Sequence, residues 1–592
     1  MKKYSCLILS VFILGACTKN FQQINTDPIS FPTASPEAIM NNVFKRTNDV
    51  LAYKNQEICH WIYLTRIGGG RYDVSDAGFW QNMYVNVLEN IQQVFNQYGK
   101  DTGFVNRVQI ARIWQSYVYS MLTANYGPIP TTQANNINNL TTVMFESEDS
   151  VYLRILSTLK DAAARIDPAK DKMAYDVIYN GDLLKWKKFA NTLRLRIALR
   201  CMKNLGSVAT GAVQEVMADE ANTISLETET AKMAYENVSG NEHPFWRTEI
   251  KPYTKRDDLP KLSDYLLNFF RAYKDPRLYT WYDSVPLANR ATIQDTLTSV
   301  NDDSLRVVVY PLPYYGIPKA VTPNNIWTLP STTPPGVPSG PAITTYSTVS
   351  GNIFGTSASS VAQAARPILI LNYAESNFLK AEAAMLGLGG SKSAEQYYTA
   401  GIDATFAYWG VSSTARDAYK AVPGIHFGTS GTGFANYLGM VRTDIPADDL
   451  SKIWIQEWLN YWPDQSMDFW CLQRRTQVLQ LPPHTNPTLT VNTLYVDVPL
   501  RGAYLSTTNS LNPDGYKDAL SKLGVGTLNE EQYNPYIALH FVKPFTPINW
   551  AAVPVNYDLS YLEKWYGNTI EELKAAAQAS GFTYSISNTY KP

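Results

Sequence analysis

One cysteine near the start of the chain stands where a lipid could be attached. A basic start at Lys2 and Lys3 leads into a short apolar run over residues 7–14, and residues 14–17 read LGAC. The small residues before Cys17 allow a signal peptidase to approach, and the free thiol can then be alkylated with diacylglycerol. We therefore predict a lipoprotein signal peptide over 1–16 and a lipid anchor at Cys17, followed by a tether that ends at residue 34.

The lipid anchor predicts a location. The apolar run is well short of the roughly 18 residues that a membrane-spanning helix needs. Each buried methylene contributes about 0.8 kcal/mol, and two or more acyl chains hold a protein firmly on a membrane. A chain processed at Cys17 would therefore be tethered to a membrane outside the cytoplasm. The alternative is an ordinary secretory signal with a chance cysteine.

Residues 61–84 combine aromatic rings, directional polar groups and the three glycines 68–70. Planar rings can stack on the apolar faces of sugars, while Arg, Asn and Asp can bond to hydroxyl groups. The glycines leave the backbone free to bring such side chains together. For Trp80 and Arg71 a ligand-binding role is favoured, whereas Trp61 and Tyr84 could equally fill the core. The candidate ligand residues of this segment are Trp61, Arg71, Tyr72, Asp73, Trp80, Asn82 and Tyr84.

The middle of the chain offers a second set of rings. Residues 283–365 are rich in Pro, Ser, Thr and Gly and lack helical periodicity, which predicts a long loop-rich insertion with short β-like pieces. Aromatic side chains on loops above a rigid scaffold make natural binding surfaces. The candidates in and just before this insertion, led by Trp281 and Trp327, are Tyr279, Trp281, Tyr282, Tyr314, Tyr315 and Trp327.

Catalytic and metal-binding motifs are missing. The five histidines are scattered, with no HExxH or similar ligand spacing. The run GTSGTG at 428–433 fits neither a nucleophile elbow nor a phosphate-binding loop, because Thr432 replaces the required glycine and no lysine follows. We therefore expect no catalytic residues, no metal and no cofactor.

Composition narrows the class of protein further. The net charge is −1 and only 17% of the 592 residues are charged, so no basic field could collect nucleic acid. Aromatic residues are abundant, with 39 Tyr, 14 Trp and 21 Phe, which suits a large core and a surface that stacks on sugars or peptides. Behind the signal and the anchor, Cys59, Cys201 and Cys471 remain, and we expect buried free thiols.

Apolar spacing predicts a mainly helical fold. Ser35 and Pro36 begin the first helix, and apolar residues follow at helical spacing. A capping box at Ser393 and Gln396 begins the second half of a helical hairpin over about 367–409. The predicted helices are 35–51, 105–126, 148–166, 181–205, 367–386, 393–409, about 450–461 and about 559–579. The helix over 181–205 should be apolar on one side and basic, through its lysines and arginines, on the other.

One segment of this helical pattern is specific enough to suggest a family. Residues 176–200 (DVIYNGDLLKWKKFANTLRLRIALR) resemble the SusD/RagB family of outer-membrane nutrient-binding lipoproteins. Further family-like pieces follow in the expected order: YGPIP at 126–130, YKDPRL at 273–278, NYAESNFLKAE at 372–382, WIQEW at 454–458, and Arg501 with Tyr504. The resemblance covers essentially the whole mature chain.

This resemblance implies a fold, a partner and a role. The fold would be one domain over 35–592: a TPR-like scaffold of about four helix pairs, with an irregular, loop-rich ligand-binding half. The partner would be a TonB-dependent outer-membrane β-barrel transporter, which receives a captured oligosaccharide or peptide. The implied location is the outer membrane at the cell surface, although the first acid after Cys17 is Asp27, whereas many surface-exported members carry acids directly after the cysteine.

The motif residues themselves favour structural roles. Glu375 and Glu382 lie two turns apart on one helix face and, paired with arginines, would brace the hairpin. Arg194 and Arg196 face different sides of their helix, and each could hold a carboxylate or a carbonyl. Two functions from other classes stay open: a lipid-anchored hydrolase, and a helical-repeat scaffold that binds only proteins.

Overall fold

The computed structural model describes residues 34–61, 77–136, 142–286, 346–430, 448–479 and 500–524, together with short pieces elsewhere. Those pieces are 65–66, 292–298, 305–311, 314, 316, 434–435, 441–442, 539–542 and a few residues beyond 556. Cys17, Arg71, Tyr72, Asp73, Tyr315 and Trp327 lie outside the described residues, as does most of the predicted helix 559–579.

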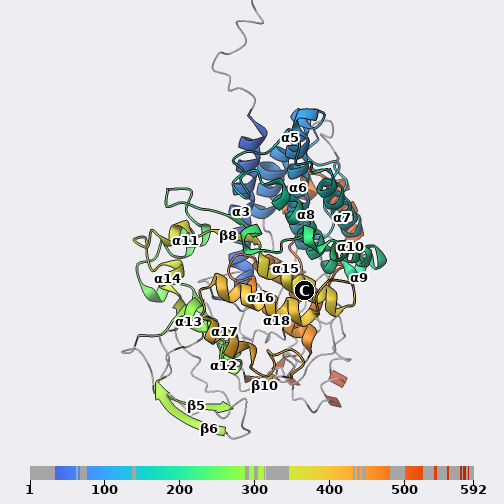
Figure 1. The fold of residues 1–592 in the computed structure, drawn as a ribbon. Helices are drawn as coiled ribbons and strands as arrows, with labels where there is room; N and C mark the ends of the chain where they lie inside the picture. The colour runs from blue at the N-terminus through green and yellow to red at the C-terminus, as the bar shows by residue number, and fades with distance from the viewer. Residues whose placement is uncertain are drawn as a thin grey trace, which may run out of the picture.

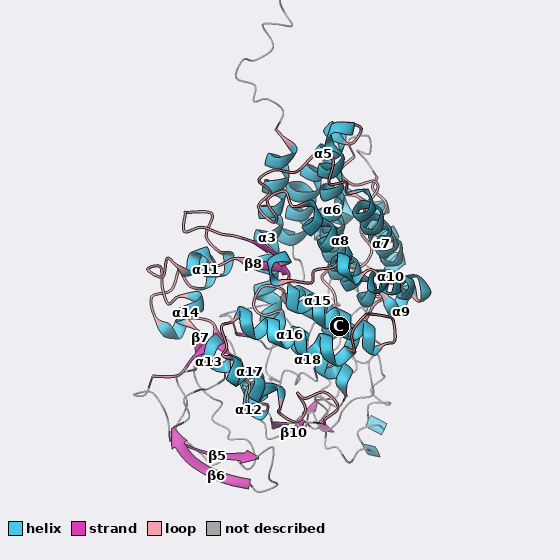
Figure 2. Ribbon diagram, viewed as in Figure 1, coloured by secondary structure: helices cyan, strands magenta, loops and turns pink. Residues whose placement is uncertain are grey.

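Helices dominate the described chain (Figure 2), which confirms the predicted mainly helical fold. In the N-terminal half, α6 packs against α7, α7 against α8, and α8 against α10, and these helices stand together at the top of Figure 1. Their bounds are α3 (Pro36–Trp61), α4 (Ala77–Gln81), α5 (Glu89–Tyr98), α6 (Val105–Tyr126), α7 (Glu148–Arg165), α8 (Leu183–Arg200), α9 (Met202–Leu205) and α10 (Ser207–Ala218).

The caps explain where these helices begin. The Ser35 hydroxyl accepts a hydrogen bond from the backbone N–H of Ala38, as its position before Pro36 predicts. The Asp182 carboxylate accepts from the backbone N–H groups of Leu184 and Lys185, so α8 begins at Leu183. The predicted helix over 181–205 is interrupted after Arg200, and the short helix α9 completes it.

The predicted helical hairpin is present in the central part of the chain. α15 (Tyr373–Met385) and α16 (Ala394–Tyr408) pack against each other, and the capping box of Ser393 and Gln396 is present. The prediction that a helix spans 367–386 is wrong at its start, because residues 368–371 form β8 (Ile368–Leu371). This ILIL run is buried throughout and pairs with β2 (Ala231–Met233), while Asn372 caps the helix that follows.

The remaining elements are mostly short. α18 packs on α15, α16 and α19, and the strands form small sheets, of which one has the order β1-β3-β7-β4. The helices are α11 (Pro244–Glu249), α12 (Asp264–Ala272), α13 (Arg277–Trp281), α14 (Gly351–Phe354), α17 (Ser413–Lys420), α18 (Asp449–Asn460), α19 (Ser466–Thr476), α20 (Ser506–Leu511) and α21 (Pro513–Leu523). The strands are β1 (Thr65–Arg66), β3 (Lys261–Leu262), β4 (Tyr282–Asp283), β7 (Thr348–Val349), β9 (Phe434–Ala435), β10 (Val441–Arg442), β11 (Tyr557–Asp558) and β12 (Tyr584–Ser585).

The predicted insertion is less irregular than its composition suggests. β5 (Thr292–Thr298) and β6 (Leu305–Pro311) pair antiparallel and lie at the bottom of Figure 1. Its last part returns to the core, since Tyr346, Val349 and Phe354 are buried. The described parts of 283–365 therefore include both a β-ribbon and a segment that packs on the helices.

The three arginines of α8 bind carboxylates of neighbouring elements, which is the structural role expected for Arg194 and Arg196. Arg194, Arg196 and Arg200 are all buried, because α8 lies in the middle of the helical layers. Arg196 pairs with Glu375 of α15, with 2.7 Å between Nη2 and Oε2. This pair connects α8 to α15. The lysines of this helix remain near its outer surface.

The predicted pairing of the α15 acids with arginines is confirmed, although both arginines lie on helices other than α16, the partner of α15 in the hairpin. Glu375 pairs with Arg196, and Glu382 accepts two hydrogen bonds of 2.6 Å from Arg475. These pairs tie α15 to α8 and to α19. The cysteines behave as expected too, because Cys59, Cys201 and Cys471 are buried free thiols.

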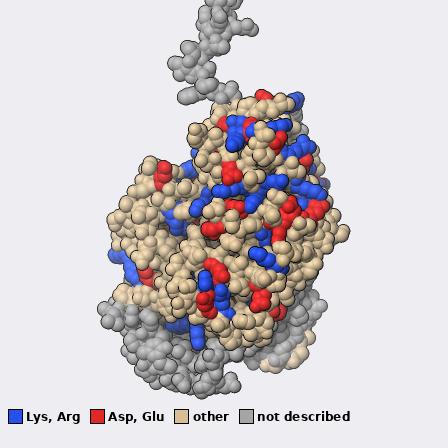
Figure 3. Space-filling view, in the orientation of Figure 1, with Lys and Arg blue, Asp and Glu red and all other residues tan. Residues whose placement is uncertain are grey.

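Charged side chains on the face shown in Figure 3 are scattered, with both signs intermixed. This agrees with the near-zero net charge of the chain. Over the part of the chain that the structure describes, no helix has the length and hydrophobicity needed to cross a membrane.

Candidate functional site

Trp80 lies at the centre of a group of aromatic rings. It contacts four rings from three other parts of the chain, and we call these five residues the Trp80 cluster. The centroid distances from Trp80 are 4.7 Å to Tyr84, 4.9 Å to Tyr126, 5.9 Å to Phe145 and 5.9 Å to Tyr504. The other four rings are buried, whereas Trp80 is only partly buried. Trp80 is therefore the partly exposed member of the cluster, and it lies on four buried rings.

Hydroxyl groups hold the cluster on a single backbone segment. The Tyr84 hydroxyl donates to the carbonyl of Pro130 at 2.8 Å, and the Tyr504 hydroxyl donates to the carbonyl of Pro128 at 2.6 Å. Tyr126 precedes the same segment, at the end of α6. Burial raises the pKa of the Tyr84 phenol well above its usual range. Tyr84 and Tyr504 thus both bind the YGPIP segment at 126–130, which is the shared base of the cluster.

A π-helix follows Trp80 directly. Residues Asn82–Leu88 form η1, whose wide last turn is closed by the backbone N–H of Glu89 donating to the carbonyl of Tyr84. Asn135 braces the same carbonyl at 3.0 Å and the Glu89 carboxylate at 2.9 Å through its amide nitrogen. π-Helical turns are rare and occur frequently at functional sites. Sequence reasoning missed this turn, since nothing in hydrophobic spacing separates a π-helix from an α-helix.

A carboxylate lies beside the cluster. Glu146 follows Phe145 of the cluster, and its Oε1 accepts hydrogen bonds from the backbone N–H (2.8 Å) and the hydroxyl (2.7 Å) of Thr132. Partial burial acts to raise the pKa of Glu146, but the hydrogen bonds from Thr132 and the Arg154 guanidinium outweigh it and hold that pKa below its usual value. Glu146 is therefore ionised, and its Oε2 accepts hydrogen bonds from the Arg154 guanidinium at 3.2 and 2.9 Å.

Two of the predicted ligand residues are placed in the core instead. Tyr84 is buried and its hydroxyl is used by Pro130, so the core alternative holds for it. Trp281 is completely buried, stacked on Trp462 with 4.4 Å between centroids and edge-on to Trp409. The prediction that Trp281 faces a ligand is wrong, because its ring packs between Trp409 and Trp462 in the core.

Of the other predicted ligand residues, the structure shows the contacts of Asn82, and the side chains of the rest lie outside the described residues. Asn82 donates to the carbonyl of Gly78 and accepts from the side chain of Asn86, so its amide is engaged within its own helix. Trp61 ends α3, but its side chain is outside the described residues, as are Arg71, Tyr72, Asp73 and Trp327.

The helix α13, just before the insertion, presents an exposed ring. Tyr279 is 69% exposed and meets the partly buried Tyr314 edge to face at 5.7 Å. Tyr282, the neighbour of Trp281, is buried. Tyr279 and Tyr314 form a second, smaller aromatic surface, away from the Trp80 cluster in sequence.

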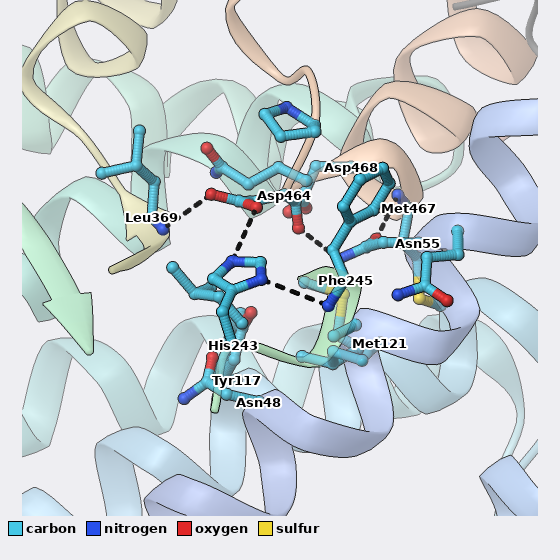
Figure 4. Close-up of a pocket in the computed structure, with 16 residues that line it drawn as sticks. Asn48, Asn55, Tyr117, Met121, His243, Phe245, Leu369, Asp464, Met467 and Asp468 are labelled. Carbon is cyan, nitrogen blue, oxygen red and sulfur yellow. Dashed lines mark hydrogen bonds and ion pairs between the residues drawn. The ribbon is translucent and has the colours of Figure 1, made fainter. Parts of the chain in front are cut away.

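A small cavity lies deep between α3, α11 and α19 (Figure 4). His243 occupies its wall: Nδ1 accepts from the backbone N–H of Phe245 at 3.1 Å, and Nε2 lies 2.8 Å from an Arg366 nitrogen. Arg366 also binds the Asp464 carboxylate at 3.0 and 2.6 Å. Burial, with the nearby Arg366 charge, lowers the pKa of His243 to about 4. A cavity of about 20 Å³ has room for a water molecule and no saccharide.

A wide groove of about 620 Å³ opens between the end of α5, the start of α6 and the end of α7. Its lining residues include no aromatic side chain, so it offers nothing on which a sugar ring could stack. In the described part of the chain, no group of His, Cys, Asp and Glu could hold a metal ion.

Comparison with known proteins agrees with this architecture. Residues 25–504 match the family model described as "Starch-binding associating with outer membrane", which is a SusD-like family. The chain belongs to this family. No curated protein matches the sequence. Tyr126 and Tyr504 thus lie in segments whose family-like character was visible in the sequence, although their place beneath Trp80 was not.

Several solved structures share the SusD-like fold. A chitin-binding protein has a TM-score of 0.63 at 19% identity, covering 86% of this chain and 100% of its own. A chitin-binding SusD homologue from Flavobacterium johnsoniae has a TM-score of 0.62 at 20% identity, covering 86% and 98%. A SusD-like protein of Bacteroidetes has a TM-score of 0.64 at 19% identity, covering 86% and 100%. Identities this low show the fold alone.

Proposed function

We propose that this SusD-like protein is a non-catalytic nutrient-binding lipoprotein that captures an oligosaccharide on the Trp80 cluster. The observation that carries the proposal is the partly exposed indole of Trp80 on four buried rings. A ring held from below loses little conformational freedom when a sugar stacks on it, so most of the stacking energy contributes to affinity.

Polar groups near the cluster suit a sugar. Glu146 is an ionised acceptor and can receive hydrogen bonds from hydroxyl groups. Arg71, Tyr72 and Asp73 belong to the same proposal, as donors and acceptors supplied by the glycine-rich segment before Trp80. The chitin-binding names of two structural neighbours support an oligosaccharide over a peptide.

The remaining parts of the proposal concern location and delivery. Lipidation at Cys17 would anchor the protein to the outer membrane, in keeping with the family description. We propose that the ligand is passed to a TonB-dependent β-barrel transporter in that membrane, with the protein at the cell surface. Neither capture nor delivery requires cleavage of the ligand.

The test is binding calorimetry on a panel of oligosaccharides that includes starch and chitin fragments. Chromatography of the mixtures should show every oligosaccharide intact. Trp80→Ala should weaken binding by roughly 1–3 kcal/mol, by analogy with ring stacking on bases. Trp409→Ala is the matched control, since Trp409 is also partly buried but packs on Trp281 and Trp462.

Full affinity in a folded Trp80→Ala protein would contradict the proposed site and direct attention to Tyr279 and Tyr314. Appearance of shortened products with the wild-type protein would contradict the non-catalytic role.

A further inference from the structure

Glu457 is a buried acid that forms no ion pair with the residues that the structure describes. It lies near the end of α18, which packs on α15 and α19, and is almost completely inaccessible to water. Its Oε1 contacts the hydroxyl of Tyr461 at 2.6 Å, and its Oε2 has no hydrogen-bond partner within the described part of the chain. A carboxylate buried with so few donors is strongly disfavoured.

The neighbouring charges are already matched. Arg196 of α8 is bonded to Glu375 of α15, and the two terminal nitrogens of Arg475 of α19 are bonded to the two oxygens of Glu382. Asp468, also on α19, pairs with Arg196 at 3.3 Å and with Arg200 at 2.8 Å. These three acids therefore share three arginines, and Glu457 is the fourth acid of the group.

The hydrogen-bond geometry around Tyr461 requires one more proton. Its hydroxyl lies 2.6 Å from Glu457 Oε1 and 3.0 Å from Glu375 Oε1, yet it carries only one hydrogen. If both acids were ionised, one of these contacts would bring two acceptors together. Glu375 is the carboxylate of the pair, because Arg196 and the Gln465 amide both donate to it.

We propose that Glu457 is a neutral carboxylic acid at physiological pH and that its proton orders a one-way chain of hydrogen bonds through the protein core. In this chain the Glu457 O–H donates to Tyr461, the Tyr461 O–H donates to Glu375, and Arg196 donates to Glu375. The chain links α18, α15 and α8, so loss of the proton would loosen the contact between these helices.

Electrostatics support this assignment. Burial, with the nearby Glu382 charge, raises the pKa of Glu457 to about 8, against the lowering effect of the Arg475 charge. In the unfolded chain the same acid ionises near its usual value of 4.5. Between about pH 4.5 and 8 the unfolded state releases the proton first, so this group makes the protein less stable as the pH rises.

The experiment is urea unfolding of the full-length protein at a series of pH values, comparing the wild type with Glu457→Gln. Glutamine has the shape of the neutral acid and cannot ionise. As the pH rises from roughly 5 to 8, the folding equilibrium constant of the wild type should fall relative to that of Glu457→Gln, by up to about tenfold per pH unit. Glu395→Gln, at an exposed position of α16, is the matched control and should parallel the wild type.

Infrared spectroscopy of the wild-type protein gives a second readout if Glu457→Gln fails to fold. A neutral carboxylic acid C=O band should persist at pH 7 and disappear above about pH 9, and Tyr461→Phe should shift it by removing its acceptor. A constant ratio between wild type and Glu457→Gln across the pH series, or no neutral acid band at pH 7, would overturn the proposal.

Discussion

The rings of Trp80 and Tyr504 meet edge to face, with 5.9 Å between their centroids and an interplanar angle of 87°. Trp80 lies in the first short helix after the glycine-rich segment, and Tyr504 lies near the end of the region that matches the family. The Tyr504 hydroxyl fixes this contact by donating to Pro128 at 2.6 Å. A residue remote in sequence therefore supports the indole that we expect to bind the ligand.

This relationship predicts different effects from removing the ring and removing the hydroxyl. Tyr504→Ala should destabilise the protein by about 3–5 kcal/mol and weaken oligosaccharide binding, because Trp80 loses a supporting ring. Tyr504→Phe should cost about 0.5–1.5 kcal/mol of stability and keep most of the affinity. Urea unfolding and calorimetry measure the two effects, and equal affinity for both variants would show that Tyr504 does not support the site.

Leu193 and Ile197 lie one turn apart on α8 and are fully buried. Replacement of either by Ala should lower the free energy of unfolding by about 2–5 kcal/mol, since a cavity remains. Leu184→Ala, at a 58% exposed position near the start of the same helix, is the control and should change little. Arg71→Ala should also leave the melting temperature nearly unchanged. If Arg71→Ala lowered stability more than Leu193→Ala, then Arg71 would belong to the core and the assignment of core and ligand-binding residues would be wrong.

The Arg196–Glu375 pair should behave as a buried ion pair. Arg196→Met leaves Glu375 without its main partner and should cost about 3–5 kcal/mol. Combining it with Glu375→Gln should recover part of the loss, because no uncompensated charge remains. Arg194 pairs with the half-exposed Glu215, so Glu215→Gln should cost at most about 1 kcal/mol. Denaturant unfolding tests the order, and equal losses at the two sites would contradict it.

His243 should make the protein sensitive to acid. Its pKa is lowered to about 4 in the folded state, so as the pH falls below 6.5 the unfolded chain takes up the proton first. Stability should therefore decrease from about pH 6.5 to 4, by roughly 3 kcal/mol from this group. Asn can still cap α11, so His243→Asn should flatten this slope, whereas His426→Asn at an exposed position should not. Unchanged slopes in unfolding experiments at a series of pH values would rule out His243 as the source.

Cys17 should be the site of membrane attachment. Cys17→Ala should leave the protein unprocessed or soluble, and labelled fatty acid should enter the wild type only. Cys471→Ala removes a buried thiol and should keep the label. Membrane association of Cys17→Ala in cells that lack the transporter would contradict the anchor.

Local patterns in the sequence predicted much of the scaffold. Helix starts at Ser35 and Ser393 depend on side chains that bond to backbone three residues away, so they can be read without tertiary information. The arginines of α8 and the acids of α15 could also be assigned a structural role from the sequence, because charged side chains in such helices need partners of opposite charge. Which residues are those partners could not be read from the sequence. The ILIL run at 368–371 was misassigned, because a short apolar run is compatible with a buried strand or with a helix.

By itself, the sequence predicted a lipid anchor at Cys17, which stays a prediction, and it determined the mainly helical class and the resemblance to the SusD/RagB family. The tertiary structure decided which aromatic side chains are available. Trp80, Tyr84 and Trp281 were all candidate ligand residues, yet packing leaves Trp80 partly exposed and buries the other two rings. Exposure depends on contacts from Tyr126, Phe145, Trp462 and Tyr504, and no local pattern encodes contacts between segments this far apart.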